Sequence, residues 1–174
     1  MDTRHTSIFS LLIVVLTAGL ITACGNFGSF TFTEESQEIE VEGQSSPLSN
    51  LLPTEIPMQV NLQQELERQD ASGAQSVHLI DLYFEMTDNT DEEHFDFMNE
   101  ITITVDADGQ SEEELAWNLD IPEGQNRFHL DTDSDLDLKP YVEEGMSLET
   151  DVSGSAPDND ARFKVYAEFR VHVL

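Results

Sequence analysis

Apolar and polar residues alternate with a period of two through most of the chain after residue 38, most clearly near the C-terminus. A period of two places successive side chains on opposite faces of a strand, so residues 161–173 predict a long strand with one buried face. The predicted inward set is Phe163, Val165, Ala167, Phe169, Val171 and Val173. The outward set is Arg162, Lys164, Tyr166, Glu168, Arg170 and His172, and we expect its cations to pair with carboxylates on neighbouring strands.

The same alternation recurs in shorter stretches that are separated by Gly, Pro and Asp-Gly turn signals: 38–42, 76–87, 101–106, 115–121, 128–130 and 148–152. About seven or eight short strands of this kind predict an all-β fold, an antiparallel β-sandwich in which each sheet buries one face. Within 76–87 we expect two opposite faces: Ile80, Leu82, Phe84 and Met86 on one, and Val77, Leu79 and Tyr83 on the other. Trp117 falls on the apolar face of its stretch, which predicts a core position rather than a sugar-stacking one.

One short helix interrupts the strand pattern. Asn61 reads as an N-cap with Gln at the third helical position, Leu62 and Leu66 lie one turn apart, and Ser72–Gly73 would end the helix. The segment 95–99, FDFMN, predicts a tight turn whose Phe and Met side chains fill the core.

The N-terminal segment has the composition of a targeting signal. Arg4, His5 and the α-amino group form a short positive region, partly offset by Asp2, and 16 uncharged residues follow at 8–23. A membrane-spanning helix needs about 20 apolar residues, so this run is typical of a signal peptide.

The only cysteine, Cys24, directly follows this run. Residues Ile21-Thr22-Ala23-Cys24 resemble the lipobox of bacterial lipoproteins. The resemblance implies thioether lipidation of Cys24, cleavage before it, and acylation of the new α-amine with a long chain such as palmitate. Gly25 follows where an Asp usually signals inner-membrane retention, so the resemblance implies the outer membrane if the source is Gram-negative. The alternative is an ordinary secretory signal with an incidental cysteine.

These features divide the chain into three parts: a lipoprotein signal peptide at 1–23, a tether at 24–37, and a β-sandwich domain at 38–174. The tether rests on the mixed Gly, Ser, Thr and Phe composition. A first strand is an open alternative there, because Phe30 and Phe32 alternate with polar residues.

Charge narrows the possible partners. The chain of 174 residues carries 36 Asp and Glu against 7 Lys and Arg, a net charge of −29. This excess argues against nucleic-acid binding and against electrostatic docking on an anionic lipid surface. Hydrophobic residues still make up 39% of the chain, enough for a core. Such acidity is typical of a protein that works in a saline setting, with calcium-dependent folding as the alternative.

Four aspartates at every second position, Asp131, Asp133, Asp135 and Asp137, raise the question of a calcium site. An EF-hand loop that begins at Asp131 needs Gly at its sixth position and Glu at its twelfth, where this chain has Leu136 and Val142. We therefore expect a solvated strand edge, with a looser calcium site as the alternative and no other cofactor or metal.

Motifs of catalysis are missing from the sequence. The four histidines after the signal segment are isolated, so a zinc site has little support, and there is no G-x-S-x-G or phosphate-binding glycine loop. We assign no catalytic residues. FDFMNEITITV and DLKPYV resemble segments of uncharacterised bacterial lipoproteins with small all-β domains, which implies a fold but no activity.

The sequence therefore predicts a cell-envelope lipoprotein held to the lipid bilayer through Cys24. Its acidic β-sandwich would be a non-enzymatic binding or structural domain with a protein or glycan partner. Two alternatives stay open: a carboxylate-dependent envelope hydrolase, and a calcium-dependent adhesion or binding module.

Overall fold

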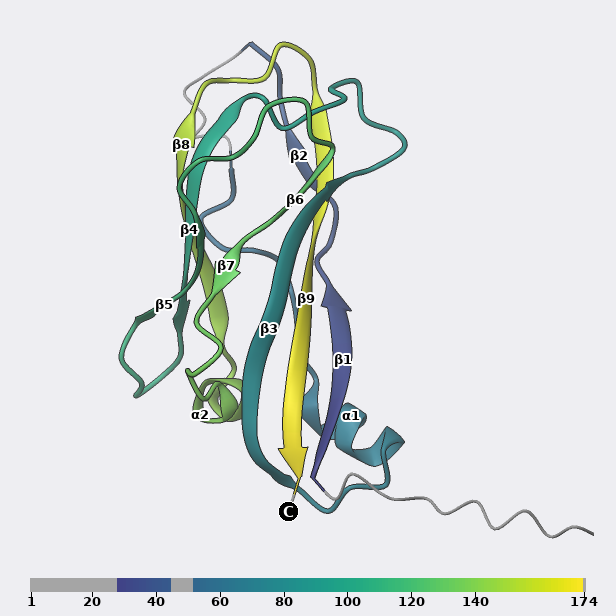
Figure 1. Cartoon of the computed structure of the whole chain (residues 1–174), viewed down its shortest axis with the longest axis vertical. Helices are drawn as coiled ribbons and strands as arrows, with labels where there is room; N and C mark the ends of the chain where they lie inside the picture. The colour runs from purple at the N-terminus through teal and green to yellow at the C-terminus, as the bar shows by residue number, and fades with distance from the viewer. Residues whose placement is uncertain (1–27, 45–51, 174) are drawn as a thin grey trace, which may run out of the picture.

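The computed structural model describes residues 28–44 and 52–173 and contains two antiparallel sheets packed face to face (Figure 1). The elements are β1 (Ser29–Glu35), β2 (Ile39–Val41), α1 (Leu62–Arg68), β3 (Ala74–Met86), β4 (Met98–Asp106), β5 (Glu113–Asn118), β6 (Arg127–His129), β7 (Asp131–Thr132), α2 (Lys139–Glu144), β8 (Ser147–Gly154) and β9 (Ala161–Val173). One sheet has the order β1-β9-β3-β6 with β2 also paired to β9, and the other has the order β7-β5-β4-β8. The predicted all-β sandwich is confirmed, although it has more strands than expected and a second helix.

Strand β9 is the centre of the five-stranded sheet. It pairs with β3 along one edge, and with β1 and then β2 along the other. The hydroxyl of buried Ser36 bridges the gap between β1 and β2, because it accepts a hydrogen bond from the Val165 N–H at 2.9 Å. The predicted inward face of β9 is confirmed: five of its six apolar side chains are buried and Val173 packs against the core at its edge.

A β-bulge makes the prediction for residues 76–87 wrong in its first half. Leu79 pairs with Phe169 and Asp81 with Glu168, so Ile80 is an extra residue between two consecutive partners. An extra residue shifts the alternation by one position. Val77 and Leu79 before the bulge are therefore buried together with Leu82 and Phe84 after it, and β3 has a single core face.

A second bulge overturns the predicted core position of Trp117. Ile103 pairs with Ala116 and Thr104 with Glu114, so Leu115 is the extra residue of β5. Leu115 and Ala116 are both buried, and the alternation after them turns Trp117 to the outer face, where it is only partly covered.

The predicted helix is confirmed at its start and wrong at its end. The Asn61 side chain accepts a hydrogen bond from the Gln64 N–H at 3.1 Å, and Leu62 and Leu66 are buried. The helix ends at Arg68, four residues before Ser72. The second helix, α2, was not predicted although its signals are present: a proline in the first turn and Gly145 with φ of 84° at the C-cap.

The segment before β4 fills the core as predicted. Phe95, Phe97 and Met98 are buried, and the Met98 N–H donates to the Phe95 carbonyl at 2.9 Å to close the turn. Phe95 meets Phe128 edge to face, with 4.8 Å between ring centroids.

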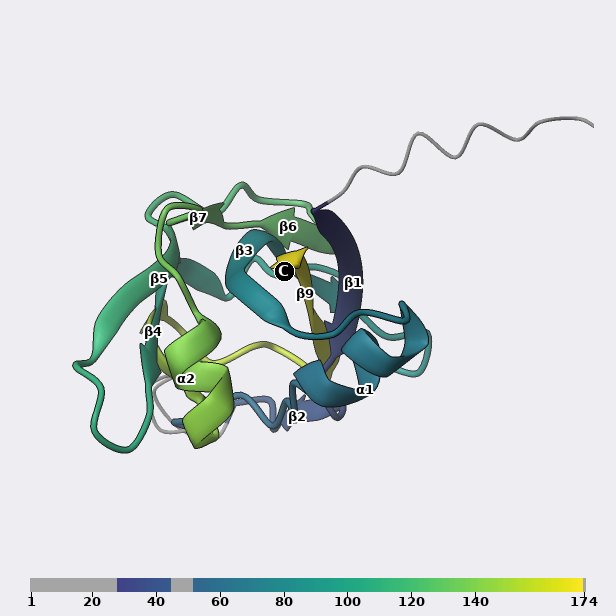
Figure 2. The same ribbon diagram turned by 90° about the horizontal axis from the view of Figure 1, so that it is seen from below.

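The predicted tether at 24–37 is wrong for the residues that form β1. Ser29–Glu35 pair with β9 in continuous register, and the Val173 N–H donates to the Gly28 carbonyl at 2.8 Å. The start of β1 and the end of β9 therefore lie together, at the lower end of the molecule where α1 and α2 also lie (Figures 1 and 2). Cys24 lies outside the described residues, and within the described ranges no helix is long and apolar enough to cross a membrane.

Candidate functional site

The outer face of the five-stranded sheet collects most of the positive charge of this acidic protein. We call the following set the basic face: His78 on β3, Arg127 and His129 on β6, and Arg162, Lys164, Arg170 and His172 on β9. The alternation of β9 sends four of these side chains outward, and the register places the β3 and β6 residues beside them. Four of the seven Lys and Arg residues of the chain belong to this face.

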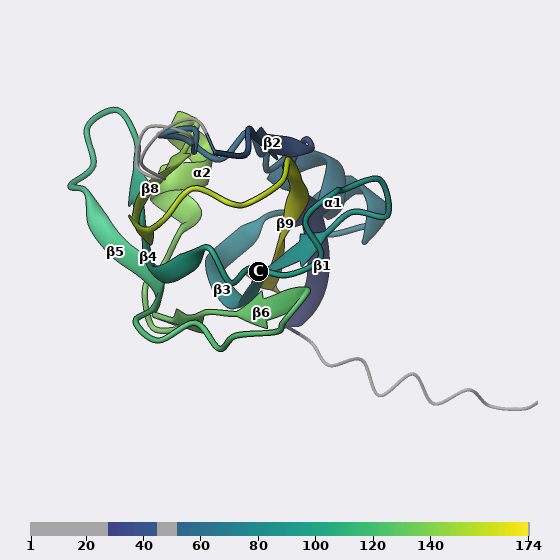
Figure 3. The ribbon, with the colours of Figure 1, turned by 90° about the horizontal axis from the view of Figure 1, so that it is seen from above.

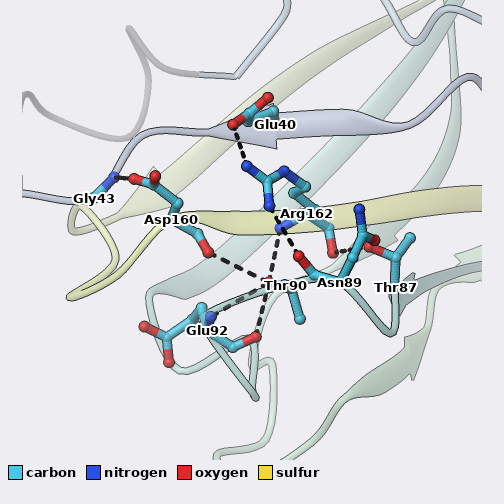
Figure 4. Close-up of polar contacts among 8 residues, drawn as sticks. All are labelled: Glu40, Gly43, Thr87, Asn89, Thr90, Glu92, Asp160 and Arg162. Carbon is cyan, nitrogen blue, oxygen red and sulfur yellow. Dashed lines mark hydrogen bonds and ion pairs between the residues drawn. The ribbon is translucent and has the colours of Figure 1, made fainter.

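At the upper end, Arg162 ties β9 to two other segments (Figure 4). Its guanidinium donates to the Glu40 carboxylate at 2.7 Å and to the Asn89 carbonyl at 2.8 Å. The hydrogen bond to Glu40 and the charge of that carboxylate raise the pKa of Arg162. The cation is therefore already satisfied, and its role is to hold the upper loops.

The loops at the upper end form one polar network (Figures 3 and 4). The Asp160 carbonyl accepts from the N–H groups of Asp91 and Glu92, each at 3.1 Å, and its side chain accepts from the Gly43 N–H at 2.9 Å. A Cβ at Gly43 would lie 2.7 Å from the Asn159 carbonyl carbon, so only glycine allows this close approach. An open hollow of about 460 Å³ beside the network is lined by Asp91, Asp158 and Asp160.

The middle of the basic face is a row of paired aromatic and charged side chains. Tyr83 and Tyr166 stack with 4.9 Å between ring centroids, and the Arg127 guanidinium lies 5.0 Å from the Tyr83 ring centre. Arg127 also binds the Glu85 carboxylate, and this hydrogen bond raises the pKa of Arg127. Desolvation by its neighbours raises the pKa of the Tyr83 hydroxyl, although the Arg127 charge opposes the shift.

Two more pairs complete the middle of the basic face. Lys164 binds the Glu35 carboxylate at 3.1 Å, which raises the pKa of Lys164, and His129 Nδ1 lies 2.8 Å from Asp81 Oδ1. The expected pairing of the β9 cations with carboxylates on neighbouring strands is thus confirmed for Arg162 and Lys164.

The lower end of the basic face is different, because its cation has no carboxylate partner among the described residues. Arg170 is exposed and makes no ion pair there, which contradicts the pairing expected for it. His78 lies across from it on β3, and the ring centroids of His78 and His172 are 5.8 Å apart. His78 Nε2 lies 2.9 Å from the Ser76 hydroxyl, whereas its buried Nδ1 has no hydrogen-bond partner.

An open groove of about 790 Å³ lies between α1 and α2. Leu62, Leu66, Val142 and Met146 contribute apolar side chains to it, and its one carboxylate is Glu143. The groove therefore has one ionisable acid rather than a pair.

A smaller hollow of about 300 Å³ forms around Trp117 on the outer side of the four-stranded sheet. Leu119, which is 64% exposed, His129 and Asp131 line it with Trp117. It places the single tryptophan at the surface beside a histidine and a carboxylate.

The four aspartates that the sequence singled out do not share a site. Asp131 belongs to the Trp117 hollow, and the Asp133 side chain accepts a hydrogen bond from the Asp135 N–H at 3.0 Å. Asp137 accepts from the N–H groups of Val77 and Lys139, both at 3.0 Å, so it fixes the entry to α2 against β3. Within 28–44 and 52–173 no group of three or more His, Cys, Asp or Glu side chains is arranged to hold a metal ion.

Sequence reasoning found the cations of β9 but missed the face that they form. The alternation along β9 alone predicts that Arg162, Lys164 and Arg170 lie on the same face of the strand. The contributions of β3 and β6 depend on the bulge at Ile80 and on the register between strands, which no local signal in the sequence encodes. No protein-family model matches the chain, and no curated protein matches it either.

Proposed function

We propose that the protein is a lipoprotein of the cell envelope, anchored to the bilayer through acylated Cys24. The observation that carries this proposal is the sequence Ile21-Thr22-Ala23-Cys24 at the end of an uncharged run. A diacylglyceryl thioether plus a third acyl chain buries enough methylene groups, at about 0.8 kcal/mol each, to hold a protein permanently. With Gly25 after the cysteine, the outer membrane is the destination if the source is Gram-negative.

The position of β1 supports a domain that sits close to the bilayer. β1 begins at Ser29, five residues after Cys24. An extended chain advances at most about 3.6 Å per residue, so about 18 Å separates the lipid-bearing residue from the sheet at most. The lower end of the sandwich therefore faces the membrane, and the upper loops face away from it.

The domain itself is proposed to bind or organise a partner rather than to catalyse a reaction. A carboxylate-dependent hydrolase, the runner-up, needs two acids at a cleft, and the groove between α1 and α2 offers only Glu143. The basic face is instead a broad sheet surface on which carboxylates hold three of the four Lys and Arg side chains, and such a surface suits recognition of a protein or glycan in the envelope.

Metabolic labelling tests the anchor. Cells that express the full-length protein with a labelled fatty acid should incorporate label into the wild type and the Ser29→Ala control, and both should sediment with membranes. Cys24→Ala should lose the label and leave the membrane fraction after export. A labelled, membrane-bound Cys24→Ala variant would contradict the proposal.

A further inference from the structure

Arg170 is an exception among the basic residues that the structure describes. Five others have a carboxylate within 4 Å: Arg68, Arg127, Lys139, Arg162 and Lys164 pair with Glu65, Glu85, Glu143, Glu40 and Glu35. In a chain with 36 acidic side chains against 7 basic ones, a cation without such a partner is the least expected arrangement. The charge of exposed Arg170 is therefore available to a ligand.

The residues directly opposite Arg170 on the neighbouring strands are hydrogen-bonding groups without negative charge. It lies opposite Thr31 on β1 and His78 on β3, and His172 follows on the same face, opposite Ser29 and Ser76. Directly opposed side chains on adjacent strands stand about 4.5–5.5 Å apart at their Cβ atoms. We call Arg170, His78 and His172 the lower cluster.

One nitrogen atom of the lower cluster has no hydrogen-bond partner. His78 Nδ1 is buried and has no hydrogen-bond partner, while His78 Nε2 lies by the Ser76 hydroxyl. Buried polar atoms are almost always paired in proteins. The His78 ring is thus held by Ser76 through Nε2 and by no hydrogen bond through Nδ1.

The next carboxylate along the face is Glu168, two residues before Arg170 on β9 and opposite Asp81. Asp81 is held by His129 at 2.8 Å, whereas Glu168 makes no ion pair with any described residue. A cation and an anion that are both unpaired thus stand side by side on one strand. This spacing suits a ligand that carries a negative and a positive group next to each other.

We infer that the lower cluster binds the phosphate of a zwitterionic phospholipid headgroup, with the ammonium of that headgroup beside Glu168. The planar guanidinium of Arg170 matches two phosphate oxygens, and the histidines add N–H donors. The choice of a lipid as the source of the phosphate rests on the proposed anchoring at Cys24. His172 lies opposite Ser29, which is five residues after Cys24, so the start of β1 beside the cluster lies within about 18 Å of the lipid-bearing residue.

The charge of the whole protein selects the kind of lipid. A net charge of −29 is repelled by an anionic bilayer, whereas a zwitterionic surface carries no net charge. Phosphate is still present at that surface, in an interfacial layer of roughly 5–8 Å per leaflet. The lower cluster would thus fix how the domain stands on the membrane that anchors it.

A titration of the full chain in a non-ionic maltoside detergent, which carries no phosphate, tests the inference. The probe is glycerophosphoethanolamine, the readout is the ring C–H resonances of His78 and His172, and His94 serves as an internal reference. Saturable shifts of His78 and His172 are expected. Arg170→Gln should weaken binding by about tenfold or more, because a charge-assisted hydrogen bond is lost. Arg127→Gln, a paired cation on the same face, should bind as the wild type does.

Further arms separate the sources of the phosphate. Glu168→Gln should weaken the binding of glycerophosphoethanolamine without changing the binding of inorganic phosphate. In the wild type, inorganic phosphate should bind more weakly than glycerophosphoethanolamine. Equal affinity for both probes would overturn the lipid assignment, and no shift with either would overturn the site. The titration does not use the anchor, so its failure is distinct from a failure of the fatty-acid labelling.

Discussion

Two adjacent residues of β9 have opposite surroundings and make the sharpest comparison at the scale of single side chains. Phe169 is fully buried and stacks on Phe32 with 5.3 Å between ring centroids, whereas Arg170 is exposed. Phe169→Ala should lower the free energy of unfolding by about 3–5 kcal/mol, because the ring leaves a cavity between the sheets. Arg170→Gln should change it by less than about 0.5 kcal/mol. Urea denaturation of both variants measures the difference, and equal small effects would mean that β9 is not a core strand.

The fold disturbs the pKa of the Glu34 carboxylate. It sits on the inner side of β1 opposite Ala167, and burial raises its pKa above 4.5, helped by Glu65 and opposed by a hydrogen bond from the Asn61 backbone and by Arg68. A raised folded-state pKa means that the native state holds this proton more tightly than the unfolded chain does. The stability that the protonated group contributes is present below the unfolded pKa and is lost as the pH rises through the folded value.

Glu34→Gln should therefore stabilise the protein at pH 7, and the difference from the wild type should vanish below pH 4.5. Thermal melts at both pH values give the measurement, with Gln in place of the exposed Glu123 as the control, because no ion pair holds that carboxylate among the described residues. A variant that is less stable at pH 7 would show that the charged form of Glu34 is the favoured one.

The residue scale also marks the limit of prediction from sequence. The inward face of β9 could be predicted because its alternation runs unbroken for 13 residues. Ile80 and Trp117 could not be placed, because each β-bulge inserts one residue whose only trace is a register shift against a partner strand. Beyond the bulge the sequence pattern looks regular while every side chain has changed face.

Among the elements, the upper loops depend on the hydroxyl of Thr90. It accepts hydrogen bonds from the Arg162 N–H at 2.9 Å and the Glu92 N–H at 3.3 Å, and it donates to the Glu92 carbonyl at 3.0 Å. Thr90→Val keeps the shape but leaves the Arg162 N–H without its partner, which should cost about 1–3 kcal/mol of unfolding free energy.

Thr33→Val on the exposed side of β1 is the matched control and should change the unfolding free energy by less than about 0.5 kcal/mol. Hydrogen exchange of the Arg162 amide adds a local readout, because Thr90→Val should speed it. Unchanged exchange in Thr90→Val would show that the backbone of the loops holds itself without the hydroxyl.

A helix boundary could be predicted where the local sequence carried a single clear signal. The Asn61 cap and the Leu62–Leu66 pair placed the start of α1, while Asp70 at φ of 54° ended the helix before the expected Ser72–Gly73. α2 was missed because the alternating aspartates before it suggested a strand edge. Asp131 does lie on the edge strand β7, whereas Asp133 accepts from the Asp135 N–H and Asp137 from the Lys139 N–H just before α2.

The whole molecule has two unlike ends, and this polarity follows from topology rather than from composition. The acidic loops that Asp160 holds together lie at the upper end (Figure 1). The lower cluster and the start of β1 lie at the other end, and β1 begins five residues after Cys24. Composition predicted an acidic domain, and the alternation of apolar and polar residues predicted a β-sandwich. Neither could predict that Arg170, which has no ion pair among the described residues, lies beside the start of β1, because that depends on which strands pair with β9.

Electrostatic self-repulsion should dominate the response of the whole molecule to salt. Salt weakens the surface ion pairs, such as Arg162–Glu40 and Lys164–Glu35, but each exposed pair contributes only about 0–1 kcal/mol. Repulsion among the remaining carboxylates opposes folding throughout a chain of net charge −29, and it is screened at the same time. At 1 M salt the Debye length falls to about 3 Å, so the second effect should win and stability should rise with NaCl. Thermal melts in detergent from low to molar NaCl measure this, and a flat or falling melting temperature would contradict the repulsion argument.

The same melts in a few millimolar CaCl2 test the calcium alternative. A rise of the melting temperature well beyond that in NaCl at equal ionic strength would restore four residues as candidates for a calcium site: Asp131, Asp133, Asp135 and Asp137.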